Sequence, residues 1–167
     1  MNRPVFLHDS GILNDVLFPG ASDDAKKCFL WFQSSWEGGK NFRGPLLCYY
    51  EVRRRQVINS LSLQHDEPKR RYYVANVRWV DRLCSLIGIE KVDARTMRIA
   101  SRLWAEAHSG GYQTAPKASM DADVIIAASA IRRSRGERDV VIITKNVDHL
   151  ARYDTPFVTA RRWHEPF

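Results

Sequence analysis

The chain has 167 residues, of which 44% are hydrophobic and 11% aromatic, which is enough for one buried core and short for two. It carries 26 Lys and Arg against 19 Asp and Glu, giving a net charge of +7 and an isoelectric point near 9.6. This positive excess favours a polyanionic partner, with nucleic acid as the leading candidate. We therefore expect a single domain over residues 1–167.

The cysteines and the amino terminus exclude several classes of protein. Cys28, Cys48 and Cys84 are odd in number and lack CxxC spacing, which argues against a disulfide framework or a zinc site. The first apolar run ends after three residues, too early for a signal peptide, and no window reaches the ~20 apolar residues of a membrane span. We expect a soluble, cytoplasmic protein with no membrane partner.

The chain opens with a strand, an acidic turn and two helices. Residues 5–7 form a short apolar run that predicts a buried strand, and Asp9 follows it directly. Ser22 is a predicted N-cap for a helix over residues 25–35, which leaves Trp36 in a glycine-rich loop. Most tryptophans are expected in the core, with Trp36 as the exception.

The middle of the chain contains a third apolar run and a long helix. Residues 46–50 read as a strand that runs into a basic helix, which places Glu51 at a strand-to-helix junction. Apolar positions four and three apart then predict a helix over residues 69–87, carrying Tyr73, Val77, Val80, Cys84 and Ile87 on one face. That face packs on the core or, alternatively, forms a dimer seam.

The second half again alternates strands and helices. Residues 89–92 predict a short strand, and Asp93 caps the helix after it. Asp123 lies near the start of an alanine-rich helix, and residues 139–144 contain four β-branched aliphatic residues in succession, the pattern of a strand covered on both faces. A short helix and a last strand near residues 157–159 complete the chain.

This order of elements predicts an α/β sandwich around a mainly parallel sheet. Such sheets bind ligands beyond the carboxyl ends of their strands. Asp9, Glu51 and Asn146 each follow a predicted strand, and the helix of Asp123 can bring its carboxylate to the same edge. Because carboxylates bind hard divalent metals, we expect one acidic pocket at that edge.

Four acidic segments, taken in order, also carry a family resemblance. The segment that begins at Asp123 is similar to an Asp-x-x-Ile-Ala-Ala helix, and the segment Thr144-Lys145-Asn146 is similar to a Thr-x-Asn motif. Asp9 matches the acidic residue of the family's opening turn, and Glu51 matches its glutamate. Together they resemble the PIN-domain ribonucleases, and within that family the toxins of bacterial VapBC toxin–antitoxin pairs. The chain departs from the pattern at Asn146 and His149, where many relatives have Asp.

The resemblance implies a PIN-like three-layer α/β/α sandwich and a magnesium- or manganese-dependent endoribonuclease, held off by a partner antitoxin. Two divalent ions about 3.5–4 Å apart can activate water and stabilise the leaving oxygen of a phosphodiester. We assign Asp9 and Asp123 as principal metal ligands and Glu51 as a ligand or an orienter of ligated water. Asn146 is a weaker neutral ligand or a supporting group. The expected products carry a 5′-phosphate and a 3′-hydroxyl.

Other polar residues are candidates for supporting roles. Ser10 and Thr144 can hydrogen-bond Asp9 or ligated water, or else satisfy local backbone groups. Asp121 and Asp148 are further candidates, with a helix cap as the alternative for Asp121. The basic residues expected to hold RNA phosphates, unless they form a solvated face, are Arg53, Arg54, Arg55 and Lys145.

Two functions stay open on the sequence alone. The first is the metal-dependent ribonuclease, acting as the toxin of a type II pair. The second is a non-catalytic PIN-fold module with an RNA-binding or regulatory role. This alternative stays open because the fourth acidic position is occupied by the neutral Asn146. A homodimer is also expected, from the resemblance and from the apolar face over residues 73–87.

Overall fold

The computed structural model describes residues 3–63, 65–111, 121–135 and 138–166. Within these ranges the chain forms a five-stranded sheet in the order β3-β2-β1-β4-β5, and each neighbouring pair of strands is parallel. The strands are β1 Val5–His8, β2 Asn41–Pro45, β3 Ile89–Glu90, β4 Val140–Ile143 and β5 Val158–Arg161.

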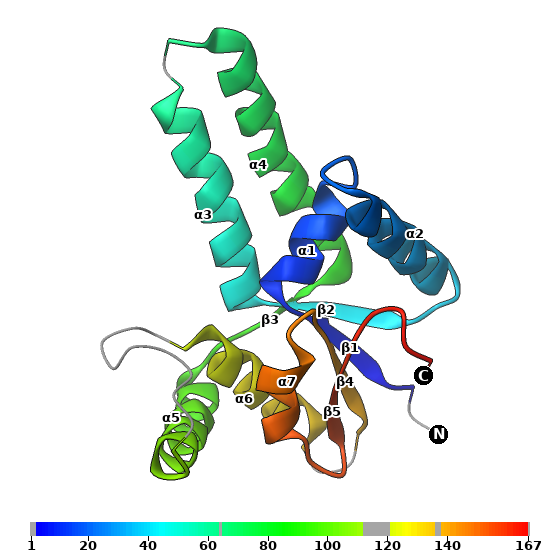
Figure 1. Cartoon of the computed structure of the whole chain (residues 1–167), viewed down its shortest axis with the longest axis vertical. Helices are drawn as coiled ribbons and strands as arrows, with labels where there is room; N and C mark the ends of the chain where they lie inside the picture. The colour runs from blue at the N-terminus through cyan, green and yellow to red at the C-terminus, as the bar shows by residue number, and fades with distance from the viewer. Residues whose placement is uncertain (1–2, 64, 112–120, 136–137, 167) are drawn as a thin grey trace.

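Helices cover both faces of this sheet. Figure 1 shows α1 to α4 on one side of the sheet and α5 to α7 on the other. The expected three-layer α/β sandwich is therefore confirmed. The helices are α1 Ser10–Leu17, α2 Asp23–Glu37, α3 Leu46–Ser62, α4 Glu67–Ile87, α5 Ala94–Ser109, α6 Ala122–Ser134 and α7 Val147–Leu150, followed by the 3-10 turn η1 Ala151–Tyr153.

The two central strands are the most buried part of the core. All four residues of β1 are buried, and so are three of the four residues of β4. Their register pairs Val5 with Val140 and His8 with Ile143. Because the strands are parallel and end together, the next residue of each, Asp9 and Thr144, emerges at the same edge of the sheet.

Acidic and hydroxyl side chains begin most of the long helices. Asp9, Ser22, Asp93 and Asp121 each accept a hydrogen bond from the backbone N–H three residues on, at the starts of α1, α2, α5 and α6. Such a cap stabilises a helix by ~1 kcal/mol. The predicted caps Ser22 and Asp93 are confirmed. Asp121 caps α6, which was the alternative to a role in the acidic site.

The strand predicted over residues 46–50 is wrong. The strand is β2, which ends at Pro45, and Leu46 already begins α3. Glu51 therefore lies in the second turn of a helix rather than at a strand-to-helix junction. Gly44 pairs with Ile89 in the strand, and a Cβ at position 44 would lie 3.1 Å from Nε2 of the buried His8, so a larger residue would crowd this ring. Trp36 was also misplaced, since it lies in the last turn of α2 and its ring stacks on Phe32.

The hairpin of α3 and α4 extends away from the sheet (Figure 1). On α4, Val80, Cys84 and Ile87 are buried, whereas Tyr73 and Val77 are only partly buried. The apolar face predicted for this helix therefore packs on the core in the half of α4 near the sheet. The side chains of these three buried residues are not accessible to a dimer partner.

None of the helices in the described ranges has the length and apolar character needed to cross a membrane.

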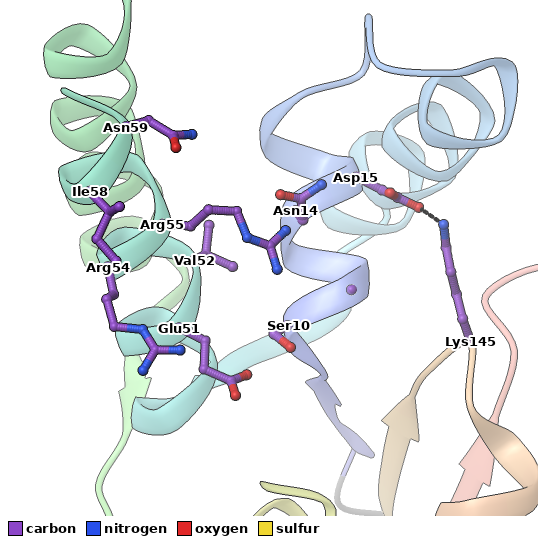
Figure 2. A pocket seen from close by; sticks show the side chains of 11 residues that line it. Ser10, Asn14, Asp15, Glu51, Val52, Arg54, Arg55, Ile58, Asn59 and Lys145 are labelled. Atoms are coloured by element: carbon purple, nitrogen blue, oxygen red, sulfur yellow. Dashed lines mark ion pairs between the residues drawn. The ribbon is translucent and has the colours of Figure 1, made fainter. Parts of the chain in front are cut away.

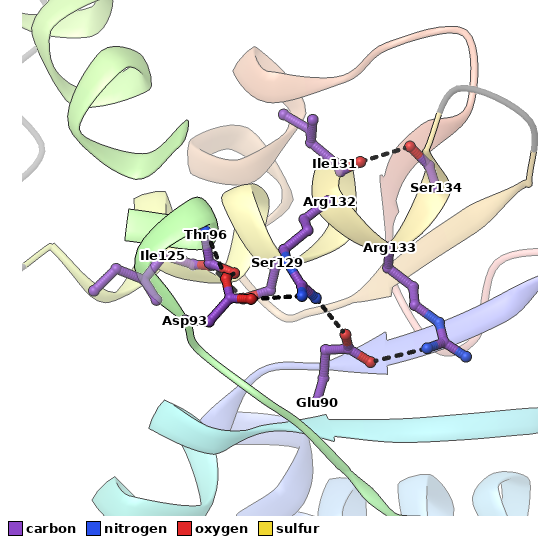
Figure 3. A network of polar contacts seen from close by, with 9 residues as sticks. All are labelled: Glu90, Asp93, Thr96, Ile125, Ser129, Ile131, Arg132, Arg133 and Ser134. Carbon is purple, nitrogen blue, oxygen red and sulfur yellow. Dashed lines mark hydrogen bonds and ion pairs between the residues drawn. The ribbon is translucent and has the colours of Figure 1, made fainter. Parts of the chain in front are cut away.

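A charged network fixes α6 beside β3 and α5 (Figure 3). The buried Glu90 pairs with Arg132 at 3.6 Å and with Arg133 at 3.5 Å. Arg132 also donates to Asp93 Oδ2 at 2.6 Å, while Asp93 Oδ1 caps α5 through Thr96. The last turn of α6 is thereby tied to two neighbouring elements, which sets the direction of the helix that carries Asp123 at its other end.

Candidate functional site

Asp9 is held by bonds to three parts of the chain. Its backbone N–H donates to the carbonyl of Ile143 at 3.0 Å, continuing the pairing of β1 with β4. Its Oδ1 accepts from the Ile12 N–H at 2.7 Å, and its Oδ2 accepts from Thr144 Oγ1 at 2.5 Å. Thr144 is fully buried and its Oγ1 accepts from the Asn146 N–H at 2.8 Å. The supporting contact between Thr144 and Asp9 is thus present.

Asp123 lies in the first turn of α6, where the positive end of the helix favours a carboxylate. Asn146 Nδ2 donates to Asp123 Oδ2 at 3.3 Å, and Nδ1 of His149 lies 3.5 Å from the same oxygen. The structure therefore brings Asp123 and Asn146 together, as the sequence predicted. His149, which had no assigned role, also contacts Asp123.

The carboxylates share one electrostatic environment. Burial raises the pKa of Asp9, and the hydrogen bond from Thr144 opposes this rise. Burial also raises the pKa of Asp123, with further increases from Asp121 and Asp9, while His149 lowers it. Burial, and after it the charges of Asp9, Glu51 and Asp123, raise the pKa of the Cys48 thiol.

Glu51 faces a cleft of about 490 Å³ between α1 and α3 (Figure 2). Ser10 and Asn14 line the α1 side of this cleft, and Arg54 and Arg55 line the α3 side with Glu51. Lys145 and its partner Asp15 also line the cleft, whereas Asp9 and Asp123 are not among its lining residues. Glu51 therefore shares an open cleft with the guanidinium groups of Arg54 and Arg55.

Two of the basic residues expected to bind RNA have acidic partners. Lys145 pairs with Asp15 of α1 and, at 3.1 Å, with Asp24 of α2. Arg53 Nε lies 2.9 Å from Asp81 of α4, which also accepts from the Tyr49 hydroxyl. Arg53 thus joins α3 to α4, whereas Arg54 and Arg55 face the cleft. These pairs join segments far apart in sequence, so spacing gave no signal for them.

The remaining candidates differ in their surroundings. Ser10 lines the cleft, and Asp148 is exposed in the first turn of α7, where no hydrogen bond or ion pair among the described residues joins it to Asp9 or Asp123. Sequence reasoning missed Tyr153, whose buried hydroxyl has no hydrogen-bond partner in the described part of the chain. Burial and the charges of Asp121 and Asp123 raise the pKa of Tyr153. An aromatic residue in a short helix gave no sign of this position.

The donor chemistry of the site suits a hard divalent cation. The side chains of Asp9, Glu51 and Asp123 offer carboxylate oxygens, which Mg²⁺ and Mn²⁺ prefer. Oδ2 of Asp121 is buried and has no hydrogen-bond partner in the described ranges. Within those ranges, however, no three His, Cys, Asp or Glu side chains converge closely enough to enclose a metal ion. The residues therefore fit a cation by their chemistry, in an arrangement more open than a closed coordination shell.

Comparison with known proteins finds the same fold in solved VapBC complexes. The chain is 15% identical to a chain of VapBC2 from Rickettsia felis, whose structure was solved with a DNA fragment from the VapBC2 promoter. The superposition covers 95% of this chain and 98% of that chain at a TM-score of 0.64. It is 14% identical to a chain of DNA-bound VapBC from Salmonella typhimurium, covering 96% and 98% at a TM-score of 0.62. This chain has the fold of these VapBC chains.

A third similar structure agrees. A chain of VapBC-1 from nontypeable Haemophilus influenzae is 13% identical, covering 96% of this chain and 99% of that chain at a TM-score of 0.64. No family model matches the sequence, and no curated protein matches it. The PIN-like fold expected from the four acidic segments is confirmed by these structures.

Proposed function

We propose that the protein is a metal-dependent endoribonuclease that acts as the toxin of a type II toxin–antitoxin pair. The observation that carries this proposal is that hydrogen bonds through Thr144 and Asn146 link the carboxylates of Asp9 and Asp123 at the edge where β1 and β4 end, with Glu51 in the wall of a cleft. Neighbouring carboxylates repel each other, as the rise that Asp9 causes in the pKa of Asp123 shows, and a divalent cation relieves that repulsion. The fold shared with VapBC complexes supports the same assignment.

The side chains have separable roles in this proposal. Asp9 and Asp123 would hold Mg²⁺ or Mn²⁺, and Glu51 would serve as a third ligand or orient a ligated water. A bound divalent cation supplies an activated water and stabilises the charge of the leaving oxygen. Thr144 fixes the rotamer of Asp9 by its 2.5 Å hydrogen bond, and Asn146 does the same for Asp123. Hydrolysis in this site leaves a 5′-phosphate and a 3′-hydroxyl.

The basic cleft is the proposed path of the RNA backbone. Arg54 and Arg55 line the cleft beside Glu51 and are exposed, so phosphates can reach both guanidinium groups. Lys145 borders the same space but is already paired with Asp15 and Asp24, and Arg53 is paired with Asp81. We therefore give Arg54 and Arg55 the larger share of phosphate binding, with Lys145 and Arg53 as weaker contributors.

Partners and setting follow from the same proposal. An antitoxin protein is supported by the fact that the similar solved structures are VapBC complexes. We also propose that the protein is a homodimer and acts in the cytoplasm. A sedimentation mass equal to one chain at micromolar concentration would rule out the dimer.

The deciding experiment is cleavage of end-labelled cellular RNA by the purified wild type and by Asp9→Asn, with Mg²⁺, with Mn²⁺ and with chelator. We expect cleavage that requires both a metal and Asp9. If no metal supports cleavage while the folded protein still binds RNA, the non-catalytic RNA-binding module is the correct function. Metal-dependent cleavage of structured DNA in preference to RNA would reject the substrate.

A further inference from the structure

An exposed aromatic ring lies next to Glu51 on α3. Tyr50 is 52% exposed, although it precedes a residue of the candidate site and belongs to a helix whose other face is buried. Aromatic side chains exposed beside a nucleic-acid path serve as surfaces on which bases stack. Consecutive residues of a helix point about 100° apart, so Tyr50 does not point with Glu51, and its link to the cleft is through Arg54, which lines it.

Arg54 orients this ring. Its guanidinium carbon lies 5.3 Å from the centroid of the Tyr50 ring, within the range of a cation–π contact. The two residues are four apart, so they are neighbours on the surface of α3. Arg54 also lines the cleft together with Glu51, and both side chains lie at the same end of α3 in Figure 2. The contact orients the ring but leaves more than half of Tyr50 open to solvent.

We propose that Tyr50 is a stacking platform for one unpaired nucleobase beside the phosphodiester that faces Glu51. Arg54 holds the ring and binds the phosphate next to that base. A base inside a duplex is already stacked on both faces, so this device selects single-stranded RNA. The inference deepens the proposed ribonuclease function by naming the class of RNA, and it requires RNA binding but not cleavage.

The alternative occupant of this surface is a protein. Leu46, Ile58 and Leu61 are also exposed on α3, at 39%, 56% and 61%, and could form an apolar seam. A two-fold contact between copies through this face would bring Arg54 and Arg55 of one chain toward the same residues of the other, because such contacts pair a surface with itself. Repulsion between these like charges favours a polyanion over a second copy.

The test uses Asp9→Asn as the background, so that RNA is bound without being cut. Affinity for a fluorescent single-stranded oligoribonucleotide is measured by anisotropy for Tyr50→Leu and Tyr50→Phe, and a 2-aminopurine base reports stacking by its quenching. We expect Tyr50→Leu to lose about 10-fold in affinity and to lose the quenching, the size of effect typical of one stacked base. Tyr50→Phe keeps the ring and stays within about 2-fold.

The matched control is Tyr72→Leu, which removes a 58% exposed tyrosine from α4 and leaves RNA affinity unchanged. Equal affinities of Tyr50→Leu and its parent overturn the inference, as does the absence of RNA binding by the parent. A change in sedimentation with unchanged RNA affinity also overturns it and assigns the surface to a protein contact. If the wild type does not cleave RNA while Tyr50→Leu still weakens binding, the nuclease proposal fails and the stacking role stands.

Discussion

Thr144 Oγ1 donates to Asp9 Oδ2 at 2.5 Å, joining the ends of two adjacent parallel strands that are 135 residues apart in the chain. Thr144→Val preserves the shape of the side chain but leaves Asp9 Oδ2 and the Asn146 N–H without this partner. Because Thr144 is fully buried, we expect the free energy of unfolding to fall by roughly 1–3 kcal/mol. Urea denaturation measures this change.

Thr144→Ser is the control, because it keeps the hydroxyl and removes only a methyl group. It should be more stable than Thr144→Val and should retain RNA cleavage, whereas Thr144→Val should lose about 10-fold or more in activity through misorientation of Asp9. Equal stability of the valine and serine variants would show that the hydrogen bond does not hold Asp9.

Asp123→Asn should stabilise the metal-free protein at neutral pH while abolishing metal binding. Burial, Asp121 and Asp9 raise the pKa of Asp123 above its ordinary value of 3.8, so its ionisation costs stability as the pH rises from 3.8 to the raised pKa. That cost persists at pH 7 and is absent below the ordinary value. We therefore expect a higher Tm for the variant in chelator at pH 7 and no advantage in strong acid.

Magnesium should reverse this order. A ligand that binds only the folded state raises its stability, so Mg²⁺ should raise the Tm of the wild type and leave that of Asp123→Asn unchanged. Differential scanning fluorimetry with Mg²⁺ and with chelator measures both effects. A wild type that does not respond to Mg²⁺ or Mn²⁺ would contradict the assignment of Asp123 as a metal ligand.

The positions of Asp9 and Asp123 could be predicted from the sequence because local signals determine them. A short apolar strand ends before Asp9, and Asp123 follows a capping residue at the start of a helix. Residues 46–50 gave the opposite result, because five residues with apolar side chains fit a strand or a helix equally well. The actual strand, β2, contains Gly44 and Pro45, which resemble a loop in sequence.

Partners that depend on tertiary contact could not be predicted. Lys145 looked like a free cation beside the site, yet Asp15 and Asp24 contact it from two other helices. Tyr153 lacked any local pattern, and only the packing of η1 places its hydroxyl within the electrostatic influence of Asp121. Spacing along the chain identifies which side chains can reach the sheet edge, but not which of them already have partners.

Glu90→Gln tests the network that fixes α6 (Figure 3). The buried Glu90 forms ion pairs with Arg132 and Arg133. Replacing its carboxylate by a neutral amide leaves two partly buried guanidinium groups without this negative charge. We expect a loss of roughly 1–3 kcal/mol in the free energy of unfolding. Glu67→Gln is the control: it removes exposed pairs with Arg70 and Arg71 on α4 and should change little. Similar urea midpoints for both variants would contradict a stabilising role for Glu90.

The three cysteines should be unreactive in the native protein. All are free and buried, and burial raises the pKa of Cys28 to about 12 and that of Cys84 to about 11, while the pKa of Cys48 also lies well above its ordinary value. Because the thiolate is the reactive form, a disulfide reagent at pH 8 should modify none of them quickly, and should modify all three in denaturant. Mass spectrometry after timed exposure counts the modified thiols. Fast modification of Cys48 without denaturant would show that α3 opens, and would contradict the complete burial of this thiol.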